Sequence, residues 1–528
     1  MKKIILSSIF LLSMATMLLT SCKKSDFDSN FYNPDAPAIS NISQMYQGLF
    51  ANNIVYPVYQ NLFTFLTDKV GIYSQTIAYD GGVRNLYAQN TSYQLYRWQG
   101  FYLQTLAPFR EMQKYYNQMS SDQQAYYQPF MVTANIFVYD QACQMVDMFG
   151  DIPFSQANQL NADGTLVMPA YDKASDIYAQ ALKDLKSFSD YLKDANASDF
   201  TQLKGYLYSS SLAGSLSEWQ RYCNSLILRL AMRISYEDEA TAQSYIQPIL
   251  NNPTNYPTID TYDESAYLLG WLPADKNQML NGYTNGYAAY APGAMANQYM
   301  APSGDPRLPV YFIQDSTGGY RGVDNTLASD AVTNGIAPSP TGNIGFARWD
   351  STSRIMNTNF PGIIMTAAET HFIKAEAYER WGGGNAETEY NSGITESIKW
   401  WYWVNQQASA QGAGISAGYD FKILPTPSAA VISTFLANAS IAYGADNHLQ
   451  KIATQKWIDF NCFQSNQAWA EYRRTKYPAL NFTPDITGNT TPPNRLLYPS
   501  EEASLNATNY NAVKNQDNMT TKIFWDVK

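Results

Sequence analysis

The sequence predicts a mostly helical fold that carries long irregular loops and few short strands. Apolar residues recur at steps of three and four in several long stretches, which is the period of an α-helix with one buried face. Alternating strand patterns are rare. Between about residues 251 and 360 the helical period is lost, and Gly, Pro, Asn, Tyr and Ser dominate. Long loops without structure of their own are often functional, so we expect the functional face in this region.

The clearest helix is expected over residues 171–192, because one face is apolar and the other carries Asp and Lys. Its apolar stripe consists of Ala174, Ile177, Ala181, Leu185, Phe188 and Leu192. Further helices with the same pattern are expected at 219–234, 363–381 and 449–472. No clean 34-residue repeat is present, so periodicity alone does not establish tetratricopeptide-like helix pairs.

Another helix is expected to end at Phe149. Gly150 suits a left-handed C-cap and Pro153 prevents the helix from continuing. Cys143 lies on the apolar stripe of this helix, so we interpret it as a small buried hydrophobic residue.

Two segments are the best strand candidates. They are LPVYFI at 308–313 and KIFWDV at 522–527, where β-branched and aromatic residues are concentrated.

Composition excludes one class of partner. The formal net charge is −10 and the pI is near 4.9, so the chain lacks the broad basic surface that binds phosphate backbones. We therefore expect no nucleic-acid binding. Aromatic residues make up 14% of the chain and charged residues only 15%, which favours a neutral, tyrosine-rich, hydrogen-bonding surface.

The N-terminus has the pattern of an export signal followed by an anchor. Lys2 and Lys3 precede an apolar stretch that ends before Cys22, so residues 1–21 are interpreted as a removable signal peptide. The sequence Leu-Thr-Ser-Cys at 19–22 resembles the bacterial lipobox, which implies that Cys22 is lipidated, with palmitate among the expected acyl chains. Several acyl chains would anchor the protein durably in a bilayer. Residues 22–41 are polar and contain Asn and Pro, as expected of a flexible tether, and residues 42–528 are expected to form one domain.

Histidine and cysteine usage argues against common catalytic and metal centres. His371 and His448 are the only histidines, and Cys143, Cys223 and Cys462 are widely spaced without a CxxC pair. We interpret His371 as a partly buried helical residue that is hydrogen-bonded to a neighbour.

Two weak motif matches favour loops. Residues 414–418 formally match G-x-S-x-G, but the flanking sequence lacks the strand and helix of a nucleophile elbow. Residues 161–164 resemble part of a calcium loop, but Ala170 stands where a bidentate Glu is required. We expect no cofactor and no metal.

Six short motifs follow one another along the chain. They are MFGDIPF at 148–154, DPRL at 305–308, MTAAETHFIKAEA at 365–377, QKW at 455–457, AWAEYRRT at 468–475, and RLLYP at 495–499 followed by Glu502 and Asn506. In this order, behind a lipobox, they resemble the SusD/RagB family of nutrient-binding outer-membrane lipoproteins.

This resemblance implies a single α-helical domain of tetratricopeptide-like helix pairs with irregular loops on the ligand face. It also implies a location at the outer membrane, exposed at the cell surface, and a SusC-type TonB-dependent transporter as partner. The protein would act as a hinged, non-catalytic lid that captures an oligosaccharide or a peptide and delivers it to the transporter.

The motif residues are expected to have structural roles. Arg473, Arg474 and Arg495 are expected to pair with buried carboxylates or carbonyls, and Trp457 and Trp469 to pack between helices.

Sugar sites combine flat aromatic rings with amide and charged hydrogen-bonding groups, and two loop segments offer both. The first candidate set, at 73–87, consists of Tyr73, Tyr79, Arg84 and Asn85, with Asp80 and Tyr87 beside them. The second set, around 271–290, consists of Trp271, Asn281, Tyr283, Asn285, Tyr287 and Tyr290. We prefer these residues to Trp98, because RWQGFYLQTLAPF is expected to be a helix that buries its indole.

Two other classes stay open at this point. A surface glycoside hydrolase on a helical scaffold needs only two carboxylates about 5 to 10 Å apart, which can come from anywhere in the chain. A structural assembly lipoprotein would bind no soluble ligand.

Overall fold

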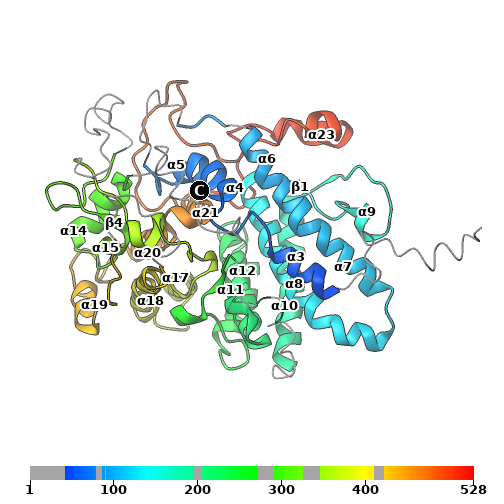
Figure 1. Ribbon diagram of the computed structural model, residues 1–528, viewed down its shortest axis with the longest axis horizontal. Coiled ribbons are helices and arrows are strands. Elements are labelled where there is room, and N and C mark those ends of the chain that lie inside the picture. The colour runs from blue at the N-terminus through cyan, green and yellow to red at the C-terminus, as the bar shows by residue number, and fades with distance from the viewer. Residues whose placement is uncertain are drawn as a thin grey trace, which may run out of the picture.

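Helices packed side by side make up most of the computed structural model (Figure 1). It describes residues 42–78, 86–89, 91–195, 205, 207, 210–270, 290–324, 345–408 and 421–528. The mostly helical fold predicted from the sequence is confirmed. Among the described residues, no helix has both the length and the apolar character needed to cross a membrane.

The first half of the chain forms helical pairs around one core, seen on the right of Figure 1. Its helices are α3 (Ile42–Phe50), α4 (Tyr59–Asn61), η1 (Leu62–Val70), α5 (Gly71–Tyr73), α6 (Thr91–Gln99), η2 (Gly100–Leu106), α7 (Ala107–Asn117), α8 (Ser121–Phe149), α9 (Gln159–Ala162), α10 (Ala174–Asp194), η5 (Ser211–Ala213), α11 (Leu216–Ile234), α12 (Glu239–Leu250) and η6 (Tyr262–Glu264).

The helix at 507–513 lies on the right of Figure 1 and contributes Val513 to the first core, whereas most of the second half of the chain builds another core on the left. The helices of this second half are η8 (Ala294–Met300), α14 (Ala301–Ser303), α15 (Leu308–Tyr311), η9 (Ser351–Ile355), α17 (Ala367–Trp381), α18 (Ala386–Gln406), α19 (Ala429–Leu436), α20 (His448–Phe460), η10 (Asn461–Gln464), α21 (Ser465–Thr475), α22 (Glu502–Leu505), α23 (Ala507–Val513) and η11 (Lys514–Gln516).

The strands are short and pair two by two, all antiparallel. β1 (Ile152–Pro153) pairs with β2 (Tyr171–Asp172), β3 (Ala266–Leu268) with β6 (Gly362–Met365), and β4 (Phe312–Ile313) with β5 (Arg348–Trp349).

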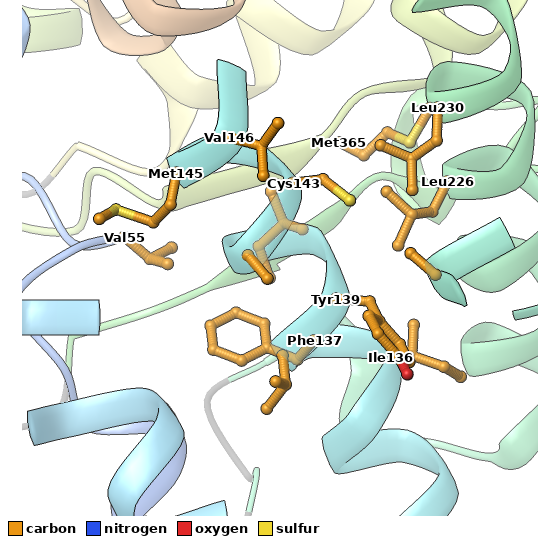
Figure 2. Close-up of a cluster of buried hydrophobic side chains, with 14 of the residues drawn as sticks. Val55, Ile136, Phe137, Tyr139, Cys143, Met145, Val146, Leu226, Leu230 and Met365 are labelled. Atoms are coloured by element: carbon orange, nitrogen blue, oxygen red, sulfur yellow. The ribbon is translucent and has the colours of Figure 1, made fainter. Parts of the chain in front are cut away.

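Cys143 is buried in the first core, as predicted. Its side chain on α8 lies among Val146 of the same helix and Leu226 and Leu230 of α11 (Figure 2). Burial raises the pKa of the Cys143 thiol, so the residue behaves as an apolar packing group. Cys223 and Cys462 are also free and buried.

The predicted helices at 171–192 and 219–234 are present as α10 and α11, although Tyr171–Asp172 form strand β2 and α10 begins only at Ala174. The helix predicted to end at Phe149 is α8, and Gly150 follows it with φ 77° and ψ −129°. The positive φ is as expected, but this ψ lies outside the left-handed helical region, so the predicted type of cap was wrong.

Two other helix boundaries also differ from the prediction. The segment 449–472 is interrupted at Asn461, which has φ 37°; its side chain bonds to Asp459 O and to the N–H of Phe463 at 3.0 and 3.1 Å. These bonds replace helical ones, so α20 ends there and α21 begins at Ser465. At 363–381, the first residues form strand β6, and the helix begins only after Thr366, whose hydroxyl caps it.

The strand predictions were correct only in part. Leu308–Tyr311 form α15, with Pro309 in the first turn where it favours a helix, and only Phe312–Ile313 are extended. The segment 522–527 forms no strand: Ile523 and Trp525 are buried alternately, but Asp526 N–H donates to Ile523 O at 2.9 Å and closes a turn.

Candidate functional site

One end of each predicted loop cluster lies in the same small apolar cluster. Ala78, Tyr290, Val323 and Phe346 pack together, apart from the two main cores, and we call them the anchor cluster. Each lies at or within two residues of a stretch outside the described residues: 79–85, 271–289 or 325–344. The chain therefore enters or leaves all three stretches at the same place on the molecule.

Backbone hydrogen bonds hold the anchor cluster together. Ala291 N–H donates to Ala347 O at 2.9 Å, and Val323 N–H donates to Ala291 O at 2.8 Å. Gly293 N–H donates to Val323 O at 2.6 Å. A Cβ on Gly293 would lie 2.7 Å from Val323 O, so this close approach of two backbones requires glycine.

Arg321 presents a fixed guanidinium beside the anchor cluster. Its Nε donates to Gly345 O at 2.5 Å, and its guanidinium lies over the Phe346 ring at 4.5 Å. The residue is exposed at the surface. Sequence reasoning missed this residue, because an arginine in a loop carries no pattern of its own.

Two turns with the same hydrogen-bonding pattern support the loop ends. In the segments DSTGG at 315–319 and DITGN at 485–489, the Asp carboxylate accepts from the N–H and hydroxyl of the Thr two residues on, and from the N–H four residues on. Burial opposes ionisation, but these hydrogen bonds outweigh it and lower the pKa of both Asp315 and Asp485. The repeated D-x-T-G pattern could have been recognised in the sequence.

The second of these turns holds the far end of the first loop cluster. The backbone N–H of Tyr87 donates to Asp485 Oδ2 at 3.3 Å, and the Tyr87 hydroxyl donates to Thr483 O at 2.9 Å. Burial and the Asp485 charge raise the pKa of Tyr87 to about 12, so its hydroxyl stays protonated and acts as a donor. Tyr87 thus ties down the chain where it leaves 79–85.

Two of the predicted ligand residues lie within the described residues, and both are buried. Tyr73 is fully buried at the end of α5, and its ring centroid lies 5.4 Å from that of Trp469. Tyr290 is 5% exposed and lies under the guanidinium of Arg348, 5.2 Å from the ring centroid. In this conformation Tyr73 contributes to the core, and Tyr290 to the anchor cluster.

The other predicted ligand residues lie outside the described residues. These are Tyr79, Arg84, Asn85, Trp271, Asn281, Tyr283, Asn285 and Tyr287, together with the predicted anchor Cys22 and the motif at 414–418. Their roles stay predictions. The expected burial of Trp98 is confirmed, since it is 5% exposed and packs against Phe149.

Both histidines are engaged in structural contacts. His371 Nδ1 is 2.6 Å from Glu389 Oε2, and its Nε2 is 2.8 Å from Asp260 O, as the sequence interpretation required. His448 Nδ1 is 2.9 Å from Glu379 Oε1. Within the described part of the chain, no group of three or more His, Cys, Asp or Glu side chains could hold a metal ion.

The motif residues have the structural roles predicted for them. Arg473 donates to the carbonyls of Trp469, Asn494 and Asp147, and Arg474 pairs with Glu376 and Glu471. Trp457 and Trp469 are buried, and Trp457 Nε1 donates to Ser74 O at 2.8 Å.

Comparison with known proteins gives a family match and a fold match. A SusD-like family model, described as starch-binding and associating with the outer membrane, matches residues 36–499. No curated protein matches the sequence.

Several solved structures share the fold. A chitin-binding protein has a TM-score of 0.73 and 23% identity, over 92% of this chain and 100% of its own. A chitin-binding SusD homolog from Flavobacterium johnsoniae has a TM-score of 0.71 and 22% identity, over 92% of this chain and 99% of its own. A SusD-like protein from Bacteroides thetaiotaomicron has a TM-score of 0.69 and 20% identity, with coverage of 92% and 99%.

Proposed function

The chain belongs to the SusD-like family of starch-binding proteins that associate with the outer membrane, and from this premise we propose that it captures an oligosaccharide at the cell surface and delivers it to a SusC-type TonB-dependent transporter. A peptide is the alternative cargo. The protein would act as a hinged lid that binds its cargo without chemical change.

The observation that carries this proposal is the convergence of the loop ends at the anchor cluster. Tyr79 follows Ala78 directly, and the segment 281–289 runs directly into Tyr290, so both tyrosine-rich clusters are tethered to one place. Several aromatic rings and carboxamides starting from one scaffold supply what a sugar requires: apolar faces for its C–H surface and hydrogen-bonding partners for its hydroxyls.

A purely binding role is consistent with the groups that the structure describes. The two histidines are held in structural contacts, and the buried carboxylates Glu376 and Glu471 are paired with Arg474. Glu369 is likewise paired with Arg229 at 2.6 Å. These groups stabilise the scaffold, which leaves recognition as the task of the loops.

The N-terminal segment would provide the membrane attachment. We propose that Cys22 carries the lipid and that residues 22–41 form the tether to α3, whose first residue Ile42 is buried. Mass spectrometry of the mature N-terminus tests this directly: a diacylglyceryl cysteine is expected, and an unmodified N-terminal Cys22 would contradict it.

Binding by the loops can be tested with point variants of the mature protein. Isothermal titration against a panel of starch, chitin and other glycan oligomers and peptides should identify a cargo. Tyr283→Ala and Tyr287→Ala should each weaken its binding about tenfold or more, because a lost stacking ring removes on the order of 1 to 2 kcal/mol.

The exposed Tyr126 of α8 offers a matched control, and Tyr126→Ala should leave affinity unchanged. Unchanged affinity in both loop variants would rule out the loop site, and release of reducing sugar by the purified protein would rule out the non-catalytic role.

A further inference from the structure

A cavity of about 240 Å³ lies between η8–α14 and the start of α20. Tyr299 and Pro302 form one side, and Asn447, Gln450 and Lys451 form the other. Asn447 and Pro302 are exposed, so the cavity reaches the surface. It is built entirely from described residues, and none of them belongs to the anchor cluster.

A buried carboxamide in the cavity wall is oriented by the core. Gln455 is 2% exposed, and its Oε1 accepts from Arg307 Nη2 at 2.7 Å. Arg307 is itself fully buried and fixed by Asp305 at 2.6 Å, so the oxygen of Gln455 must face it. The NH₂ group of Gln455 has no hydrogen-bond partner among the residues that the structure describes. Gln455 lines the cavity, so this NH₂ group can donate to an acceptor there.

The opposite wall supplies further hydrogen-bonding groups. Asn447 precedes α20, but its side chain does not cap the helix, so its carboxamide stays available. The Gln450 carboxamide lies one turn further on. Lys451 Nζ donates to the carbonyls of Ala442 and Tyr443 at 2.8 and 2.9 Å, so two of its three N–H groups are already used.

The Tyr299 side chain gives the cavity a fixed apolar wall. Its hydroxyl donates to Ala479 O at 3.1 Å, and its ring meets Trp457 edge to face, with centroids 6.0 Å apart. The ring is only partly buried, which leaves part of it for a ligand.

We propose that this cavity binds one neutral sugar ring, as a second binding site that rests on the carbohydrate-binding function proposed above. Its volume is below the range of about 300 to 1,000 Å³ typical of drug-sized ligands, so it suits a single ring. The oriented NH₂ of Gln455 and the carboxamides of Asn447 and Gln450 would bind ring hydroxyls, and the Tyr299 ring would cover the C–H face.

Two variants of the mature protein test the cavity. Gln455→Glu keeps an oxygen for Arg307 but turns the NH₂ donor into an acceptor, and Gln450→Ala removes a carboxamide from a partly exposed helix surface. Glucose and N-acetylglucosamine would be titrated and followed by ligand-observed NMR. We expect Gln455→Glu to weaken binding at least tenfold and Gln450→Ala by about three- to tenfold.

Gln247→Glu on the exposed face of α12 is the matched control and should bind as the wild type does. Circular dichroism reports whether Gln455→Glu folds; if it does not, Gln450→Ala decides the question.

The two binding proposals fail in different ways. The loop variants Tyr283→Ala and Tyr287→Ala should lose oligosaccharide binding but retain the weak binding of monosaccharides. The cavity proposal is overturned if the cavity variants bind both sugars as the wild type does, or if glucuronate binds while glucose does not. Either result leaves the loop site intact. Loss of oligomer binding in the cavity variants alone would support the cavity and contradict the loop site.

Discussion

Arg474 shows how a motif residue serves the scaffold at the scale of a single side chain. It is buried, and its two Nη atoms donate to Glu376 at 2.7 and 2.5 Å, while Nε and Nη2 donate to Glu471 at 3.1 and 2.8 Å. Burial opposes ionisation of Glu471, but Arg474, Lys456 and Arg233 outweigh it and hold its pKa well below the usual range. One guanidinium thus joins α17 to α21.

Arg474→Met should destabilise the protein by about 3 to 5 kcal/mol, because two buried carboxylates lose their shared partner. The free energy of unfolding from urea denaturation measures this. Lys186→Ala is the control, since it breaks an ion pair with Asp190 in which both side chains are at least 40% exposed. That change should cost no more than about 0.5 kcal/mol, and similar losses in the two variants would contradict the argument.

At the scale of elements, α17 and α18 approach closely at one glycine. A Cβ on Gly393 of α18 would lie 2.6 Å from the Phe372 ring of α17. Phe372 is fully buried and belongs to the second core, so it has little room to move. The small residue therefore sets how closely the two helices pack.

Gly393→Ala should destabilise the protein by about 1 to 3 kcal/mol through overpacking, despite the better helix propensity of Ala. Gly48→Ala in α3 makes the same chemical change where nothing lies within 4 Å of the new Cβ. There we expect a gain of roughly 0.5 to 1 kcal/mol. Thermal and urea unfolding of both variants would show opposite signs, and a gain in both would mean that the helices can separate freely.

Sequence patterns predicted elements well where the information is local. The stripe of α10 and the stop at Gly150 depend on neighbouring residues, so both were identified. The break at Asn461 depends on its side chain satisfying Asp459 O and the N–H of Phe463, which helical periodicity does not report. The segment 522–527 has the alternation of a strand, but no partner strand lies beside it in the described part of the chain, and pairing is a property of the fold.

At the scale of the whole molecule, the kind of candidate site was easier to predict from the sequence than its position in the fold. The tyrosine-rich loops could be recognised from the sequence. The contact among Ala78, Tyr290, Val323 and Phe346 could not be predicted, because these residues are far apart in sequence. Tyr73 resembles the neighbouring loop residues in sequence. Its ring nevertheless packs against Trp469, which lies near the other end of the sequence. Whether a side chain is exposed or buried therefore depends on residues that are distant in sequence.

The last residues of the chain contact helices from both halves of the chain. Trp525 is fully buried, and its Nε1 donates to Asp147 Oδ1 on α8 at 2.9 Å. The guanidinium groups of Arg473 on α21 and Arg233 on α11 lie 5.0 and 5.6 Å from its ring centroid. One indole therefore contacts three helices, two from the first half of the chain and one from the second.

Trp525→Ala should destabilise the whole molecule by about 3 to 5 kcal/mol, because it leaves a large cavity and removes the donor to a buried carboxylate. The exposed neighbour Val527 is the control, and Val527→Ala should change stability by no more than about 0.5 kcal/mol. Urea unfolding followed by circular dichroism would measure both. A near-zero effect of Trp525→Ala would show that the C-terminal segment only lies on a scaffold that is complete without it. The expected loss would instead show that the contacts of Trp525 with α8, α11 and α21 stabilise the folded chain.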